Sequence, residues 1–203
     1  MFLVEFSEKQ CYYIYGDFMI KVMKILAFIG FISILIFAIL YYLFSNGILL
    51  AFAITAGTFT YHFAVRLVIG YTVDGICKNK VDYNKKWFKQ KAFEERLYNL
   101  LKVKNWKAKM PTAAPDSFDM KRHTASEIAS AMCQAEIVHE IIIVASFLPI
   151  IATVWFGEFW VFFITSLLSA CYDLVFVIIQ RFNRPRILKI AEKLKVRSKG
   201  YFS

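Results

Sequence analysis

Four segments of this 203-residue chain are long and apolar enough to cross a lipid bilayer as helices. A spanning helix needs about 20 mostly apolar residues, and the chain meets this requirement at 25–44, 48–73, 137–156 and 160–179. The connections at 45–47 and 157–159 are so short that each pair of spans is predicted to form an antiparallel hairpin. The sequence therefore predicts an all-α membrane protein with four transmembrane helices arranged as two hairpins.

The composition supports a membrane location. Hydrophobic residues make up 59% of the chain, whereas soluble globular chains average roughly 45–50%. The same composition excludes a disordered, collagen-like or disulfide-scaffold chain. The cysteines form no C-x-x-C pair, so we expect free thiols rather than a zinc knuckle or a redox motif, at Cys11, Cys77, Cys133 and Cys171.

The net charge of +10 arises from 25 Lys and Arg against 15 Asp and Glu. The basic residues gather before the first apolar segment, between the second and third, and after the fourth. Because Lys and Arg in short loops mark the cytoplasmic side, both termini and the central segment are predicted to lie in the cytoplasm. Anionic lipid or an acidic substrate explains this charge better than nucleic acid. The abundance of Lys, Ile and Phe is typical of an AT-rich bacterial genome, and the predicted location is a bacterial cell membrane.

We therefore predict a single integral membrane domain over 1–203. A cleaved signal peptide is not expected, because Glu5 and Glu8 lie in a weakly apolar stretch that has no basic leader. The predicted parts are an interfacial segment, hairpin one, a cytoplasmic amphipathic segment, hairpin two and a basic cytoplasmic tail, at 1–24, 25–73, 74–135, 137–179 and 180–203.

The central segment is the largest polar region and contains no Gly-rich phosphate loop. Between 83 and 103, lysine and arginine alternate with the apolar residues Trp87, Phe88, Phe93, Leu97, Leu100 and Leu101. This pattern predicts one amphipathic basic helix over 83–103. The stretch 110–116 breaks it, and a helix restarts at 126–134 and continues into the third span.

Ionisable residues within the spans are candidates for function, because charged groups in hydrocarbon cost a few kcal/mol each. His62 and Arg66 share one face of the second span at spacing i, i+4. Glu136 and His139 share a face at i, i+3, and Glu140 follows them. The fourth span adds Asp173. In the predicted topology the cytoplasmic half contains His62, Arg66, Glu136, His139 and Asp173, near the basic run 181–186, which indicates a shared polar pocket.

Each of these residues also has a structural interpretation. Arg66 could extend toward the headgroups beside His62, and Asp173 could be the buried partner of a basic residue. The basic run 181–199 could anchor the chain to anionic lipid. Glu136 and His139 could form a structural pair at the membrane interface.

Three short motifs resemble those of a known family. The first motif, at 136–139, is an acidic residue followed by any two residues and a histidine. The second is the run Q-R-F-N-R-P-R-I at 180–187, and the third is a Trp-Lys element formed by Trp106 and Lys107. Together with their spacing they resemble the glycosyl-4,4'-diaponeurosporenoate acyltransferase family of staphyloxanthin-type carotenoid synthesis, over about 73–198. The resemblance implies transfer of a fatty acyl group to a sugar hydroxyl of a membrane glycolipid, such as a glycosylated carotenoid acid.

Acyl transfer from a thioester to a hydroxyl needs a base and stabilisation of the oxyanion. His139 is the expected base, because histidine changes charge near neutral pH, and Glu136 is expected to orient it, with Asp173 or Glu140 as alternatives. Arg184 and Arg186 could clamp the phosphates of acyl-CoA or acyl carrier protein, and Pro185 would fix the turn that presents them. The remaining substrate-binding candidates are Asn183, Gln180, Arg181, His62, Arg66, Asp173 and Trp106.

The sequence leaves other mechanisms open. No cofactor or metal is expected, with acyl-CoA or acyl carrier protein acting as the donor substrate. Glu-x-x-His on one helix is, however, also half of a di-iron carboxylate motif, to which His62 could add a ligand. Cys133 could carry the acyl group covalently. The remaining alternative is a non-enzymatic membrane adaptor or lipid-binding protein. Such a function would not explain why His62, Glu136 and His139 are grouped.

Overall fold

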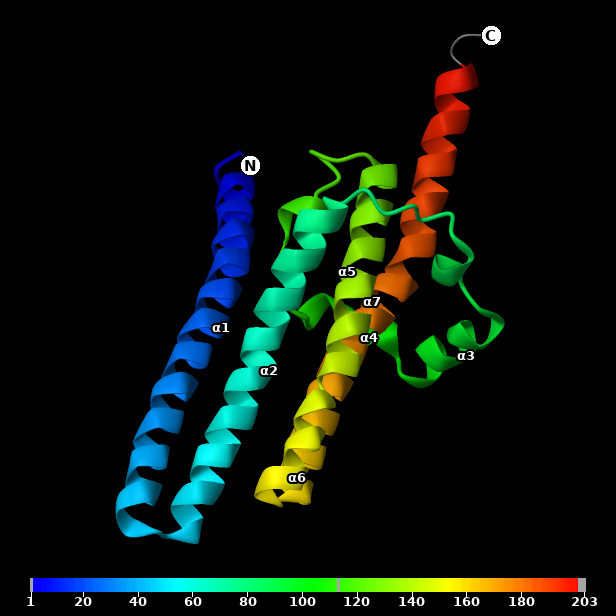
Figure 1. Cartoon of the computed structure of the whole chain (residues 1–203). Helices are drawn as coiled ribbons and strands as arrows, with labels where there is room; N and C mark the ends of the chain where they lie inside the picture. The colour runs from blue at the N-terminus through cyan, green and yellow to red at the C-terminus, as the bar shows by residue number, and fades with distance from the viewer. Residues whose placement is uncertain (1, 113, 201–203) are drawn as a thin grey trace. The chain divides into compact units, whose positions relative to one another are not determined.

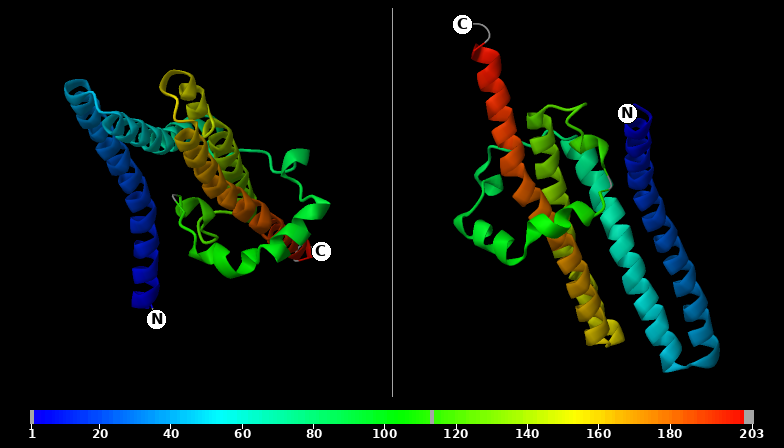
Figure 2. Two further views of the ribbon diagram at one scale, coloured as in Figure 1. Left: turned by 90° about the horizontal axis from the view of Figure 1, so that it is seen from below. Right: turned by 180° about the vertical axis from the view of Figure 1, so that it is seen from behind.

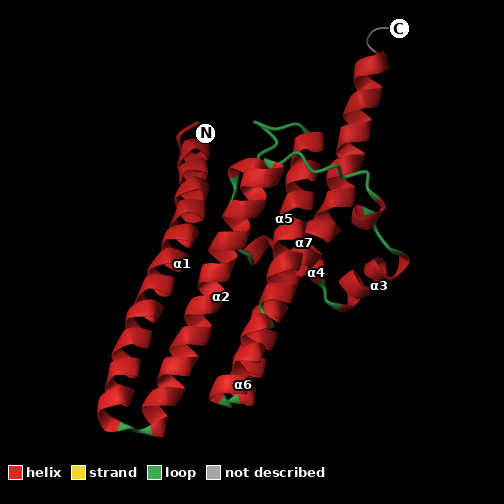
Figure 3. Cartoon of the chain, in the orientation of Figure 1, coloured by secondary structure: helices red, strands yellow, loops and turns green. Residues whose placement is uncertain are grey.

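The computed structural model describes the backbone of residues 2–112 and 114–200, and the side chains of 18–112 and 114–193. Within these residues the chain forms helices and no strand (Figures 1 and 3), which confirms the predicted all-α class. The α-helices are α1 Phe2–Phe44, α2 Gly47–Cys77, α3 Ala92–Leu100, α4 Val103–Trp106, α5 Ala125–Ala145, α6 Thr153–Phe156 and α7 Phe159–Gly200. Short 3-10 helices are η1 Lys86–Phe88, η2 Lys107–Lys109, η3 Asp116–Phe118 and η4 Leu148–Ala152.

Four helical stretches are long and apolar enough to cross a membrane, so the protein is a multi-pass membrane protein. They contain the four predicted spans and extend beyond them, at Phe18–Phe44, Gly47–Cys77, Ala125–Phe156 and Phe159–Lys193. The third stretch is not one continuous helix. Helix α5 ends at Ala145, and η4 begins with Pro149 at one of its first two positions, where a residue without an N–H is tolerated.

Helix α1 runs without a break from Phe2 to Phe44, so the segment predicted to lie at the interface, 1–24, is continuous with the first span. The side chains of 1–17, including Cys11, lie outside the described residues, as do those of 194–203 at the end of the predicted basic tail. The arrangement of the spans as two hairpins remains a prediction.

The chain divides into two compact units. We call one the apolar unit, formed by Phe18–Thr72 and Glu140–Leu174. The other, the polar unit, is formed by Met1–Asp17, Val73–His139 and Val175–Ser203. Each unit is described below by its own contacts.

In the apolar unit, a two-residue connection joins α1 to α2 (Figure 1). The rings of Phe37 and Phe52 stack with centroids 5.3 Å apart. Large apolar side chains of both helices are exposed, among them Phe28, Tyr42 and Ile48. An apolar surface of this extent is typical of residues that face lipid.

At Gly30, α1 lies in close contact with Thr60 of α2. A Cβ atom added there would lie 2.1 Å from Thr60 Oγ1, which itself donates a hydrogen bond to the Ala56 carbonyl. We expect Gly30→Ala to lower the free energy of unfolding by about 1–3 kcal/mol through overpacking, measured by unfolding in detergent micelles. Gly57→Ala is the matched control, because its added Cβ meets only a side-chain atom of Ile34 at 4.0 Å. Equal stability of the two variants would contradict the close contact.

In the polar unit, α5 begins with a capping box. The Thr124 N–H donates to Glu127 Oε2 over 2.7 Å, and the Glu127 N–H donates back to Thr124 Oγ1 over 3.3 Å. This reciprocal pair satisfies N–H groups that the first turn of a helix leaves free. It fixes the start of the helix that carries Glu136 and His139.

The prediction of a single amphipathic helix over 83–103 is wrong. The chain forms η1, an extended stretch around Lys89 and Lys91, α3, and a left-handed turn at Lys102 before α4. The physical reason lies outside the segment: the carbonyls of Trp87 and Lys89 accept hydrogen bonds from Arg181, and that of Phe88 accepts one from Arg184. The segment lies beside the part of α7 that belongs to the same unit (Figure 2).

Pro185 does not form the predicted turn. It lies inside α7, which continues as one helix to Gly200. Proline has no N–H to donate to the carbonyl four residues earlier, here that of Arg181. The predicted tail from 180 is therefore a continuation of the fourth helix, and its arginines are presented on a helix surface.

Candidate active site

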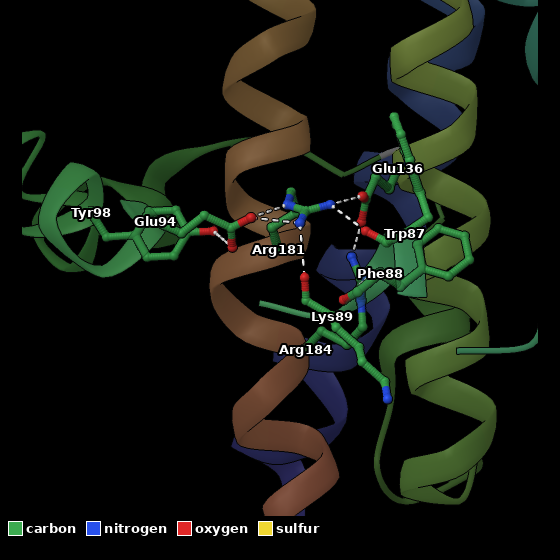
Figure 4. Close-up of polar contacts among 8 residues, drawn as sticks. All are labelled: Trp87, Phe88, Lys89, Glu94, Tyr98, Glu136, Arg181 and Arg184. Carbon is green, nitrogen blue, oxygen red and sulfur yellow. Dashed lines mark hydrogen bonds and ion pairs between the residues drawn. The ribbon is translucent and has the colours of Figure 1, made fainter. Parts of the chain in front are cut away.

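A buried ion-pair network lies at the centre of the polar unit. Glu136 on α5 is fully buried and accepts hydrogen bonds from two arginines of α7. Arg181 Nη1 lies 2.5 Å from Glu136 Oε1, and Arg184 Nη2 donates to Glu136 Oε2. Both carboxylate oxygens are therefore occupied by guanidinium groups (Figure 4).

The network continues into α3. Arg181 lies between Glu136 and Glu94 (Figure 4), and its Nε and Nη2 both donate to Glu94 Oε1, over 2.9 and 2.5 Å. The other carboxylate oxygen of Glu94 accepts the Tyr98 hydroxyl over 2.8 Å. Burial, followed by this bond to Glu94, raises the pKa of the Tyr98 phenol. Tyr98 therefore stays protonated and keeps donating to the carboxylate.

Backbone carbonyls complete the contacts of the two arginines. Arg181 donates to the carbonyls of Trp87 and Lys89, each over 3.2 Å, and Arg184 donates to that of Phe88 over 3.0 Å. The Arg184 guanidinium also lies over the Phe88 ring, 5.1 Å from its centroid. Two arginines thus hold the central segment against α5 and α7 through charged hydrogen bonds, which are stronger than neutral ones.

The charges of this network balance. Glu94, Glu136 and Arg184 are 3%, 0% and 1% exposed, and two carboxylates face two guanidinium groups. Removing one partner of such a buried pair would leave a charge without compensation, which typically costs about 3–5 kcal/mol. The network therefore positions α3, α5 and α7, and its arginines are committed to carboxylates within the protein.

His139 lies one turn beyond Glu136 on α5. Its ring stacks on Phe176 of α7, with centroids 4.7 Å apart and an interplanar angle of 11°. The ring is partly exposed, whereas Glu136 is not. The histidine is thus held at the edge of the network by an aromatic contact.

A second group of contacts surrounds Phe182. Arg186 lies over its ring at 3.9 Å from the centroid, and Lys107 of η2 lies over the same ring at 4.8 Å. The Lys107 ammonium donates to Asn183 Oδ1 over 2.5 Å. Partial burial, together with the charges of Arg186 and Lys104, lowers the pKa of Lys107. We call Lys104, Lys107, Phe182, Asn183 and Arg186 the Phe182 cluster.

Other predicted site residues lie in the apolar unit. Arg66 pairs with Asp173 over 2.5 Å and also donates to Ser169 Oγ over 2.8 Å. Both ring nitrogens of His62 are buried without a hydrogen-bond partner among the described residues, and its backbone carbonyl accepts from Arg66. These residues form a contact group of their own within that unit.

Two further predicted residues have local roles. The Trp106 indole N–H donates to the Leu101 carbonyl over 2.8 Å, which closes the turn between α3 and α4. Gln180 precedes Arg181 on α7 and is partly exposed. Within the described part of the chain, no group of three or more His, Cys, Asp or Glu side chains lies together as a metal site would require.

Sequence reasoning missed Glu94 and Tyr98. Both residues lie in the segment 83–103, which the sequence predicts to be an amphipathic helix, and on such a helix the charged Glu94 is expected to face solvent. Their spacing of four residues places them on one helix face, and both are buried there. The sequence signal for this pair is an acidic residue four positions before a tyrosine. This signal is weak, because it does not indicate that Arg181 is the partner of the acidic residue.

Comparison with known proteins identifies a family. The family model described as glycosyl-4,4'-diaponeurosporenoate acyltransferase matches residues 84–193, which is more than half of the chain. The match covers the buried network, His139 and the Phe182 cluster. No curated protein and no solved structure matches the chain significantly.

Proposed function

Because the chain belongs to the glycosyl-4,4'-diaponeurosporenoate acyltransferase family, we propose that it moves a fatty acyl group from a thioester donor to a sugar hydroxyl of a membrane glycolipid. A glycosylated carotenoid acid is the acceptor that the family description favours. The observation that carries this proposal is the position of His139, one turn from a buried network inside the matched region.

In the proposed reaction the sugar hydroxyl oxygen attacks the thioester carbonyl carbon while His139 accepts the hydroxyl proton. The tetrahedral intermediate then collapses. The carbon–sulfur bond breaks, the new ester forms, and the imidazolium returns its proton to the departing thiolate. The donor supplies the energy-rich bond, so the transfer requires no further cofactor.

Glu136 acts in this proposal as a positioning residue. Its two oxygens bind Arg181 and Arg184, which fixes α7 and thereby Phe176, the residue on which the His139 ring stacks. A base held in this way needs less reorganisation before the reaction, which lowers the barrier.

The proposed location is a bacterial cell membrane with both termini in the cytoplasm. Thirteen Lys and Arg against five Asp and Glu between 78 and 122 support it, because basic loops mark the cytoplasmic side. A soluble donor, acyl-CoA or acyl carrier protein, would then reach the polar unit from the cytoplasm, while the acceptor arrives within the lipid.

Reconstitution tests the function directly. The purified protein in lipid vesicles would be incubated with a glucosylated lipid and either radiolabelled acyl-CoA or acyl carrier protein. The expected result is a labelled glycolipid on thin-layer chromatography, absent when the acceptor lacks its sugar. A protein that binds the glycolipid but forms no ester with either donor would support the adaptor class instead.

A further inference from the structure

Two groups of basic side chains in the polar unit differ in what balances their charge. Arg181 and Arg184 bind buried carboxylates. Lys107 and Arg186 instead both contact the ring of Phe182, and partial burial together with the nearby charge of Arg186 lowers the pKa of Lys107. Neither pairs with a carboxylate among the side chains that the structure describes.

Like charges brought together without a counter-charge are unfavourable unless an anion joins them. Phe182 offsets part of the repulsion through its ring face, but cation–π contacts at exposed sites contribute only about 0.5–1 kcal/mol each, and no acid lies within the cluster. Lys104 adds a third basic side chain. Asn183 presents its amide oxygen to Lys107, which leaves the amide nitrogen as a further donor.

We propose that Lys107 and Arg186, with Asn183, bind a phosphate group of the thioester donor. The proposal rests on the acyltransferase function above and names its donor subsite. A planar guanidinium can bind phosphate through two parallel hydrogen bonds, and an ammonium supplies a compact second charge. Both cations lie against the ring of Phe182.

This assignment changes the expected role of Arg184. The sequence places Arg184 beside Arg186 as a phosphate clamp, but Arg184 is 1% exposed and bound to Glu136 and to the Phe88 carbonyl. Arg186 is exposed. Donor binding is therefore assigned to Lys107 and Arg186, and Arg184 to the positioning of α7.

The kinetic test compares donors with and without phosphate. Lys107→Ala and Arg186→Ala should each raise the KM for acyl-CoA about tenfold, as expected for a lost hydrogen bond between charged groups. The KM for acyl-pantetheine, which has no phosphate, should stay unchanged. Lys109→Ala is the matched control, since Lys109 is exposed, lies in the same 3-10 helix and is outside the cluster. An equal rise with both donors would overturn the proposal.

Direct binding separates this site from the acyltransfer activity. Coenzyme A would be titrated into the full chain in discs of neutral lipid, and again in discs containing phosphatidylglycerol. Weaker coenzyme A binding by both variants in neutral discs supports the donor subsite, even if no ester is ever formed. Unchanged coenzyme A binding, with loss of phosphatidylglycerol binding only, would assign the cluster to lipid phosphate and overturn the donor assignment.

Discussion

Replacing His139 by alanine is expected to lower the rate of acyl transfer by about 10²–10⁴-fold, the usual contribution of a general base. The imidazole stacks on Phe176 and contributes to none of the ion pairs among Glu94, Glu136, Arg181 and Arg184. Its removal should therefore leave the fold and the yield of membrane-inserted protein intact. The measurement is the initial rate of ester formation in vesicles, at saturating donor and acceptor.

His123→Ala is the matched control for this variant. His123 is partly exposed and lies 3.9–4.0 Å from carboxylate oxygens of Glu127 and Asp116, before the start of α5. It should retain the rate of the unaltered protein. A His139→Ala protein with full activity would reject the assignment of the base, and equal losses in the two variants would indicate a general effect of histidine removal.

Replacing Glu136 by alanine is expected to lower the free energy of unfolding by about 3–5 kcal/mol. The substitution leaves Arg184 buried without a carboxylate to balance its charge, although the Phe88 carbonyl still accepts a hydrogen bond from it. Arg181 keeps its ion pair with Glu94, so most of the loss in the free energy of unfolding should come from the unpaired charge of Arg184. Unfolding in detergent micelles, followed by tryptophan fluorescence, would measure the difference.

The matched control for Glu136→Ala is a substitution in an exposed ion pair. Asp116 and Arg122 are separated by 2.9 Å with about half of each side chain exposed, so Asp116→Ala should change stability by no more than about 1 kcal/mol. The double variant Glu136→Leu with Arg184→Met should recover most of the loss, because apolar residues can replace a buried ion pair. If Glu136→Ala were as stable as Asp116→Ala, the buried network would not hold the polar unit together.

The spans could be predicted from sequence for a general reason. Within lipid every backbone N–H and carbonyl must be satisfied by the chain itself, so an apolar run of sufficient length has to be helical. The four predicted segments all fall within the spanning stretches of the structure. The break after Ala145 was missed, because Pro149 lies within an apolar run that resembles its neighbours.

The polar unit could be predicted less well, because its conformation depends on partners distant in sequence. The periodicity at 83–103 predicts a helix, yet the carbonyls of 87–89 bind arginines that lie more than ninety residues later. The motifs at 136–139 and 180–187 identified Glu136, Arg181 and Arg184 as important. They did not indicate that these residues bind one another, since spacing along the chain carries no information about which carboxylate a guanidinium meets.

The pairing of Arg66 with Asp173 constrains the order in which the protein can be assembled. The two residues are 107 positions apart, so the ribosome releases the arginine-bearing helix well before it makes the aspartate. During that interval the cation has no carboxylate from the last helix to neutralise it. The ion pair can therefore form only after the fourth span has been made, and until then the charge of Arg66 has to be accommodated by other groups, such as the His62 carbonyl on its own helix, which accepts a hydrogen bond from it.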